Sequence, residues 1–117
     1  TAIRIPATWA GAQFNFEKVR DRNVWDFPLV NVASAMKLSG NTISELRLAV
    51  GAVAARPLRL TAVEASVAGK ARSEETASAA GELAIAGATP LRYNAYKIPL
   101  MRNLVKRAIR GTGAATT

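Results

Sequence analysis

Residues 15–27, NFEKVRDRNVWDF, contain the side chains whose types and spacing best suit a chemical role. Phe14, Phe16 and Lys18 are spaced two residues apart, so in a strand they would share one face, because successive strand side chains point to opposite sides. A cation at the end of an aromatic face could bind a polyanion, or it could stabilise negative charge on a bound cofactor. The alternative is an ordinary surface lysine whose stem covers apolar atoms.

The amino-acid composition limits the chemistry that this chain can perform alone. Its 117 residues include no cysteine and no histidine. The lack of cysteine excludes disulfides, thiolate nucleophiles and iron–sulfur ligation, and the lack of histidine removes the commonest metal ligand and general base. The eight glycines are scattered, with none in a phosphate-binding GxGxxG pattern. We therefore predict no catalytic residue and no metal site, and any reaction must use a bound cofactor or another chain.

Positive charge is concentrated near the C-terminus of a chain whose formal net charge is +8. Arg102, Lys106 and Arg110 are spaced to share one face of a helix, where they could follow a phosphate backbone. Cations in a last helical turn also complement the helix dipole, so this pattern is weak evidence for nucleic-acid binding. A basic nucleic-acid-binding module and a purely structural assembly domain are kept as alternative functions.

Alternating apolar and polar residues predict the strands that would position Lys18. Residues 1–5 form a strand end that Pro6 stops, and residues 12–19 form a second strand. Residues 25–30, WDFPLV, are expected to make a turn or a short helical turn capped by Asp26. Residues 30–50 then form two strands joined by a hairpin at SGNT, and the second strand ends in a bend before residue 57.

Helix signals follow in the second half of the chain. Thr61 and Glu64 have the spacing of a capping box for a short helix, which Gly69 would end. Ser73 is the expected N-cap of a second helix that runs to about residue 87. A third helix is predicted from about residue 95, or from Pro99, to residue 110.

Strands followed by helices predict an α+β fold, in which a small antiparallel three- to four-stranded sheet packs against about three helices. One domain is expected over residues 1–111, and residues 112–117 are expected to form a disordered tail. No apolar run reaches the roughly 18 residues of a membrane span, and we expect no signal peptide. The cytoplasm is therefore the default compartment, with the periplasm as an alternative.

Four segments resemble one known family: residues 5–6 (IP), 16–38 (FEKVRDRNVWDFPLVNVASAMKL), 46–59 (LRLAVGAVAARPLR) and 94–111 (NAYKIPLMRNLVKRAIRG). In this order they look like the C-terminal domain of the FAD-binding medium subunit of molybdenum hydroxylases, the carbon monoxide dehydrogenase and xanthine dehydrogenase flavoprotein family. The resemblance covers nearly the whole chain and implies the same α+β fold.

The resemblance also implies roles for individual residues. The family lysine that lies close to the flavin ring matches Lys18, which is therefore the predicted cofactor-binding residue. Arg22 and Asp26 match motif positions as well, and we expect them to hold the loop in shape.

As a member of this family the chain would be part of an oxidoreductase. In the family, a molybdopterin centre in a large subunit hydroxylates the substrate, [2Fe–2S] clusters in a small subunit carry the electrons, and FAD in the medium subunit passes them to the final acceptor. The expected partners are these subunits and the N-terminal FAD-binding domain of the same subunit, with no nucleic acid and no membrane. A homodimer of the fragment is an alternative.

The glycine-rich segments that hold the FAD pyrophosphate in the family precede this domain and are absent from the present sequence. We therefore expect the isolated fragment to fold, to be inactive and not to retain FAD. The surface around Phe14, Phe16 and Lys18 should then be exposed and available for docking against the FAD-binding part or a second copy of the chain.

Overall fold

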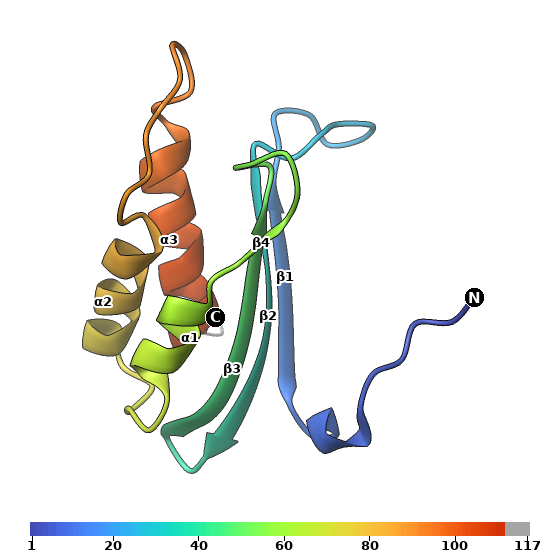
Figure 1. Cartoon of the computed structure of the whole chain (residues 1–117), viewed down its shortest axis with the longest axis vertical. Helices are drawn as coiled ribbons and strands as arrows, with labels where there is room; N and C mark the ends of the chain where they lie inside the picture. Colours follow the sequence, from blue (N-terminus) through green and yellow to red (C-terminus); the bar gives the residue numbers. More distant parts are fainter. Residues whose placement is uncertain (112–117) are drawn as a thin grey trace, which may run out of the picture.

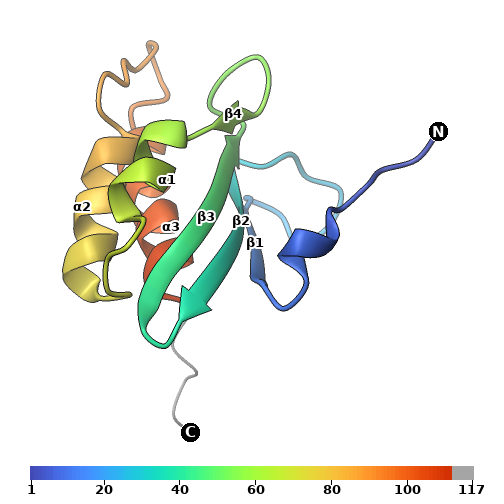
Figure 2. The ribbon, with the colours of Figure 1, turned by 60° about the horizontal axis from the view of Figure 1, so that its bottom comes forward.

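An antiparallel sheet carries helices on one of its faces and leaves the other face open (Figures 1 and 2). The structure is a computed structural model, and it describes residues 1–111. The strands lie in the order β1-β2-β3-β4, and α1, α2 and α3 form the helical layer. The elements are the 3-10 helix η1 (Ala7–Trp9), β1 (Gln13–Val19), β2 (Val30–Ser39), β3 (Thr42–Gly51), β4 (Leu58–Arg59), α1 (Thr61–Val67), α2 (Glu74–Ala84) and α3 (Lys97–Arg110).

This arrangement confirms the predicted α+β fold, including the antiparallel sheet and the three helices. Residues 112–117, for which a disordered tail was predicted, lie outside the described residues. The domain boundary at residue 111 stays a prediction. No helix within residues 1–111 is long and apolar enough to cross a lipid bilayer.

The hairpin of β2 and β3 supplies most of the sheet's contribution to the core. Its tight turn contains Gly40, whose φ of 58° lies in the left-handed region that glycine adopts without strain. Cross-strand pairs such as Val32 with Val50 place large apolar side chains opposite one another on the helix-covered face. The predicted hairpin at SGNT is therefore confirmed, with a register irregularity between Lys37 and Leu38.

The core lies between this face of the sheet and the helices. Helix α3 packs Met101, Leu104, Val105, Ala108 and Ile109 into it, and Leu100 is partly buried at its edge. The buried apolar side chains are Val30, Val32, Met36, Ile43, Leu46, Leu48, Val50, Val63, Val67, Ala77, Ala80, Met101, Leu104, Val105, Ala108 and Ile109.

The second helix begins as predicted. The Ser73 hydroxyl accepts a hydrogen bond from the backbone N–H of Thr76 at 3.2 Å, which satisfies one of the free donors of the first turn. The helix ends at Ala84, slightly before the predicted end near residue 87. Helix α3 begins at Lys97, between the two predicted starting points.

The predicted capping box of α1 is wrong. Thr61 is the first residue of the helix rather than its cap, and Leu60 at the cap position makes no side-chain bond. The carboxylate of Glu64 instead accepts the backbone N–H of Leu48 at 2.9 Å. That N–H lies just beyond the short pairing of β3 with the two residues of β4, so Glu64 supplies its acceptor. Gly69, at φ +76°, follows the end of α1 as predicted.

Two local predictions near the N-terminus are also corrected. Residues 1–5 are not a strand, because the described part of the chain pairs none of its strands with them. They extend away from the body on the side opposite the helices (Figures 1 and 2). The segment from Trp25 to Pro28 is an irregular loop, so the expected short helical turn is wrong.

Candidate functional site

The face of the sheet opposite the helices, hereafter the open face, carries the predicted site residues. Phe14 and Phe16 lie on it with 63% and 66% of their surface exposed. Lys18 shares their face of β1 and is half-buried. The cross-strand partners of the two rings are Ala35 and Ala33, which are too small to cover them. The predicted exposure of this surface is confirmed.

The ammonium of Lys18 lies at the end of β1, where the strand enters the following loop. Its Nζ donates a hydrogen bond to the backbone carbonyl of Asp26 at 2.5 Å. A lysine ammonium has three donors, so this bond leaves capacity for a second acceptor. Lys18 therefore holds the loop through one bond while its charge lies at the edge of the open face.

Residues 20–28, hereafter the aromatic loop, are held together by Asp26. Its Oδ2 accepts the backbone N–H groups of Asp21 at 3.1 Å and Arg22 at 2.7 Å. The hydrogen bond from the Arg22 backbone is the main reason why the pKa of Asp26 is lowered from its ordinary value. The guanidinium of Arg22 donates to the carbonyl of Trp25 at 2.8 Å. The predicted loop-holding role of Arg22 and Asp26 is confirmed.

The aromatic loop directs its large side chains into solvent. Trp25 and Phe27 have 95% and 88% of their surface exposed. Trp25 also has a φ of 53°, a backbone region that residues other than glycine rarely adopt. Several hydrogen bonds order this loop, and it nevertheless exposes a tryptophan and a phenylalanine. Ordered loops with exposed aromatic side chains are typical of contact surfaces.

A shallow trough of about 250 Å³ runs along the open face. The alanines of β2 and β3, Ala33, Ala35 and Ala49, form its floor, and Phe14 lies at one side. The guanidinium-bearing side chains Arg47 and Arg59 lie at the other side.

Sequence reasoning missed this trough. The alternation of large apolar residues with alanines in β2 could have indicated it. The large residues are buried on one face of the strand, and the alanines lie on the other face. The 3-10 helix η1 closes one end of the same face. The Trp9 ring lies 4.5 Å from the Lys37 ammonium and 5.3 Å from the Arg47 guanidinium, as cation–π contacts require.

Glu64 joins the helical layer to the outer strands of the sheet. Its carboxylate accepts hydrogen bonds from Nε and Nη2 of Arg59, at 2.9 and 2.8 Å, in addition to the one from the backbone N–H of Leu48. Burial by itself would raise the pKa of Glu64, but the hydrogen bonds from Arg59 and Leu48 outweigh it and the pKa is lowered. The residue is thus a buried ionised group with a structural role.

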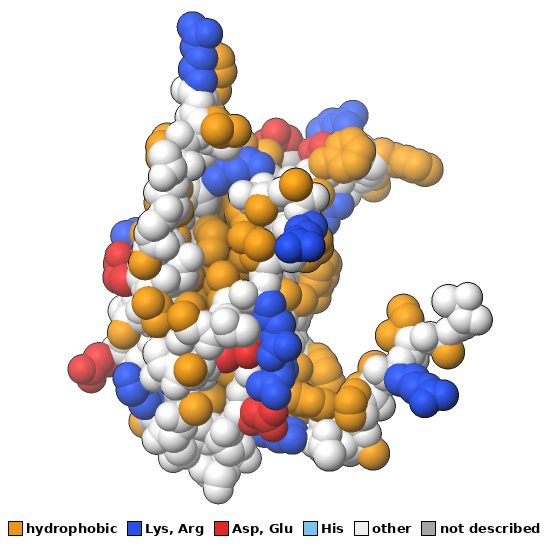
Figure 3. Space-filling view, in the orientation of Figure 1, with side chains coloured by type: hydrophobic (Ala, Val, Ile, Leu, Met, Phe, Trp, Pro, Cys, Tyr) orange, Lys and Arg blue, Asp and Glu red, His pale blue; other side chains and the backbone are white. Residues whose placement is uncertain are grey.

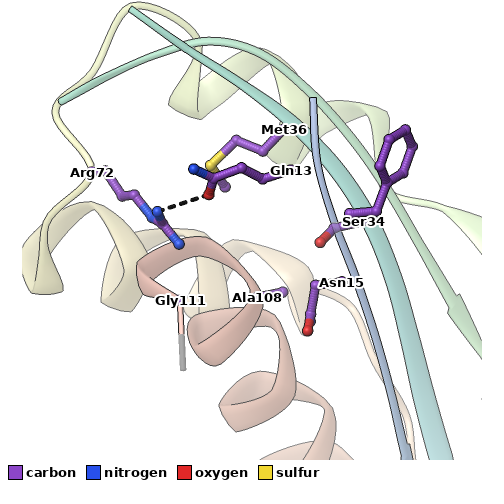
Figure 4. A pocket seen from close by; sticks show the side chains of 8 residues that line it. Gln13, Asn15, Ser34, Met36, Arg72, Ala108 and Gly111 are labelled. Carbon is purple, nitrogen blue, oxygen red and sulfur yellow. Dashed lines mark hydrogen bonds between the residues drawn. The ribbon is translucent and has the colours of Figure 1, made fainter. Parts of the chain in front are cut away.

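A polar cavity of about 240 Å³ lies between β1 and the end of α3 (Figure 4). Arg72 reaches across it, donating to the carbonyl of Ile109 and to the Gln13 side chain, both at 3.0 Å. The Asn15 and Ser34 side chains also line it. These contacts fasten the last turn of α3 to the edge of the sheet, so Arg72 acts as a clamp between two elements.

A second lysine repeats the arrangement of Lys18 at a different loop. The Nζ of Lys97, the first residue of α3, donates to the carbonyl of Ala52 at 2.7 Å. Ala52 has a φ of 64°, and it and Trp25 are the two non-glycine residues with positive φ within residues 1–111. An apolar hollow of about 360 Å³ lies beside this contact, between the loops that follow β3 and α2.

The cationic face of α3 lies against α2. The Arg102 guanidinium is 3.4 Å from Glu82, the Arg110 guanidinium is 3.1 Å from Glu74, and Lys106 also pairs with Glu74. Carboxylates of the same domain therefore partly neutralise the stripe on which the nucleic-acid alternative rested. These pairs are exposed, so each adds little stability.

The residues described here fit one part of an FAD molecule and not another. Lys18 and the exposed rings of Phe14 and Phe16 could border a flavin ring. Glycines with positive φ in residues 1–111 occur singly, at turns and helix ends. They form no run of backbone N–H groups that could hold a pyrophosphate.

Comparison with known proteins identifies the family. Residues 15–112 match the family described as the CO dehydrogenase flavoprotein C-terminal domain. The chain is 36% identical over 116 residues to the carbon monoxide dehydrogenase medium chain of Hydrogenophaga pseudoflava, covering 96% of this chain and 40% of that protein. It is 33% identical over 102 residues to the nicotine 6-hydroxylase medium subunit of Paenarthrobacter nicotinovorans, covering 81% and 35%.

Solved structures show the same fold. A carbon monoxide dehydrogenase structure from Hydrogenophaga pseudoflava, which lacks the Mo-pyranopterin moiety of the molybdenum cofactor, superposes with a TM-score of 0.75 at 35% identity, covering 84% of this chain and 35% of that one. Quinoline 2-oxidoreductase from Pseudomonas putida 86 gives a TM-score of 0.77 at 28% identity, covering 92% and 37%. The chain spans about two fifths of the length of these relatives or less. It belongs to the family of CO dehydrogenase flavoprotein C-terminal domains.

Proposed function

We propose that this chain is the C-terminal domain of an FAD-binding medium subunit in a molybdopterin-dependent dehydrogenase, and that Lys18 faces the flavin there. The observation that carries the proposal is the family match over residues 15–112, which includes Lys18. Relatives named as medium chains of carbon monoxide and glyceraldehyde dehydrogenases and of nicotine 6-hydroxylase support an oxidoreductase of this kind. The other parts of such an enzyme would be the FAD-binding part of the subunit, a molybdopterin subunit and a [2Fe–2S] subunit.

The position of Lys18 supports a role beside the flavin. FAD, when bound, would accept electrons and pass them to the final acceptor. An ammonium at the edge of the open face would stabilise negative charge that develops on a ring beside it, more strongly in a partly desolvated site than in water. The bond to Asp26 fixes the ammonium in place, so little of it would have to reorganise when that charge forms.

A measurement of the flavin reduction potential in the full-length subunit tests this role. Lys18→Ala should lower the potential, making the flavin harder to reduce, because a stabilising cation is removed. Lys97→Ala is the matched control, since Lys97 is another lysine whose ammonium donates to a loop carbonyl. If Lys18 only holds the aromatic loop, Lys18→Ala will lower thermal stability and leave the potential and the FAD content unchanged, which would overturn the proposal.

The isolated domain should fold without retaining FAD. A partly exposed ion pair contributes about 1 kcal/mol or less, whereas micromolar affinity requires roughly 8 kcal/mol. Lys18 alone therefore cannot hold the cofactor. The purified 117-residue chain should be colourless and inactive as an oxidoreductase. It should unfold cooperatively on heating, and excess FAD should not raise its melting temperature. A yellow preparation would contradict this expectation.

A further inference from the structure

The apolar hollow beside Lys97 lies at the edge of the sheet formed by β4, whereas Lys18 lies on the opposite edge strand, β1. Its walls come from the loop that follows β3, from β4, from the end of α2 with the loop after it, and from the first turns of α3. Figure 3 shows apolar side chains between the helical layer and the loop that follows β3. With a volume of about 360 Å³, the hollow is at the small end of the range of small-molecule sites.

Small residues at the end of α2 keep this hollow open. Ala84 and Ala88 line one side of it, and Gly87 has a φ of 78°, which glycine adopts without strain. Leu60 and Met101 line it as well, and both pack in or against the core. The hollow therefore exposes apolar surface of the core, and a ligand with an apolar body would remove that surface from water.

Lys97 places a positive charge in the hollow without a counter-ion among the described residues. Its side chain lines the hollow and is half-buried, and its ammonium donates to the carbonyl of Ala52 at 2.7 Å. Within residues 1–111, no carboxylate forms an ion pair with it. An ammonium has three donors, so the bond to Ala52 leaves donors for an anion.

The rest of the lining also favours an anion. Residues 46–63 and 83–111, which include the whole lining of the hollow, contain lysines and arginines but no aspartate or glutamate. Asn94, three residues before Lys97, lines the hollow too. Its Oδ1 accepts the backbone N–H of Leu91 at 2.6 Å, so its amide nitrogen is the group that can donate to a ligand. A gap left by imperfect packing would be lined by apolar groups alone.

We propose that this hollow is a binding site for a small carboxylate with an apolar body. The apolar body would lie against the wall formed by Leu60 and Met101, and the carboxylate would accept hydrogen bonds from the Lys97 ammonium and the Asn94 amide. The site goes beyond the flavin contact proposed for Lys18 and does not depend on it.

Three probes that share one ring and differ in charge test the site: benzoate, benzyl alcohol and benzylamine. Each is titrated at neutral pH into the isotope-labelled 117-residue chain, and the amide chemical shifts are followed by NMR. The amides of Leu60, Ala88 and Lys97 report on the hollow, and those of Phe14 and Ala35 report on the open face.

The expected order of affinity follows the charge of the probe. Benzoate should shift the amides of the hollow in a saturable manner, with a dissociation constant on the order of 1 mM. Benzyl alcohol should bind about tenfold more weakly, and benzylamine more weakly still, because the ammonium repels it. Equal affinities for benzoate and benzyl alcohol would overturn the proposal, since the hollow would then select apolar bodies without regard to charge. Shifts spread over the cationic surfaces without saturation would identify benzoate as a counter-ion only, which also overturns it.

A lysine variant tests the assigned partner of the carboxylate. Lys97→Met removes the ammonium and retains an apolar side chain, so it should weaken benzoate binding about tenfold and leave benzyl alcohol binding unchanged. Lys70→Met is the matched control, because Lys70 is an exposed lysine beside the β2–β3 hairpin, and it should change neither affinity. Unchanged benzoate affinity in Lys97→Met would overturn the proposal. The three probes give a charge-dependent result in the wild-type chain even if Lys97→Met does not fold.

The full-length subunit shows whether the hollow is accessible in the longer protein. Saturation transfer by NMR from the subunit to benzoate should occur, and Lys97→Met should reduce it. No transfer in the wild-type subunit would mean that other parts of the protein cover the hollow, and this result would overturn the proposal. The flavin potential of Lys18→Ala is a separate measurement, so the flavin contact and the carboxylate site can fail independently.

Discussion

The two faces of one sheet differ in how they use the same strands. The helix-covered face of β2 carries Val30, Val32 and Met36, all buried, whereas the open face of the same strand carries Ala33 and Ala35. The first face obtains stability from apolar area removed from water. The second leaves its aromatic residues in solvent, where they contribute little to folding and are available for contact. A domain can thus bury its core on one side of a thin sheet and leave large apolar side chains exposed on the other.

The largest expected contrast comes from truncating one residue on each face. Leu48→Ala should lower the free energy of unfolding by about 2–5 kcal/mol, because Leu48 is 1% exposed and its loss leaves a cavity. Phe14→Ala should change it by about 0.5 kcal/mol, because most of the ring is already in solvent. Urea denaturation of the 117-residue chain measures both. Equal losses would mean that the open face contributes to the core.

A smaller effect is expected at Glu64, where the helical layer is joined to the sheet. Glu64→Gln should cost about 1–2 kcal/mol at neutral pH, since a charged acceptor of hydrogen bonds from Leu48 and Arg59 becomes neutral. Glu45→Gln, which removes a more exposed carboxylate on the open face, is the control.

The lowered pKa of Glu64 adds a pH dependence with a definite sign. A carboxyl whose pKa is lower in the folded state stabilises the fold above its unfolded pKa, and this stabilisation is lost as the pH falls through the folded pKa. The wild-type chain should therefore lose more stability than Glu64→Gln when the pH falls below about 4.3. If the free energy of unfolding of the two proteins changed with pH in the same way, the hydrogen bonds to Glu64 would not keep its carboxyl ionised in the folded state.

The smallest effect is expected on the outer side of the helical layer. Glu74→Gln removes the negative charge shared by Lys106 and Arg110, and the melting temperature should fall by at most about 2 °C. Salt at about 1 M should abolish the difference, because it screens exposed charges. Glu75→Gln, at the neighbouring first-turn position, is the matched control. A large fall in the melting temperature that persists in salt would contradict the small contribution expected for exposed ion pairs.

Features set by neighbouring residues could be predicted from the sequence, and features set by distant ones could not. The Ser73 cap, the turn at Gly40 and the shared face of Phe14, Phe16 and Lys18 follow from local spacing. The partner of Glu64 could not be predicted in this way. The backbone N–H of Leu48 is available to Glu64 because β4 is too short to pair with it.

The trough and the N-terminal segment show the same limit at the level of surfaces. An alanine on an exposed face gives almost no signal in the sequence, because it is compatible with nearly any environment. The alternation of residues 1–5 is typical of a strand, but a strand needs a neighbour, and none of the strands within residues 1–111 pairs with this segment.

The two lysine contacts have a consequence for the speed of assembly. Lys18 and Lys97 each bind a carbonyl at or next to a residue with positive φ, so the aromatic loop and the loop after β3 are fixed while the domain is still alone. Loops that are already ordered lose little conformational entropy on contact with another surface. Association of this domain with the FAD-binding part proposed above should therefore resemble the docking of two rigid bodies, without a slow rearrangement of these loops.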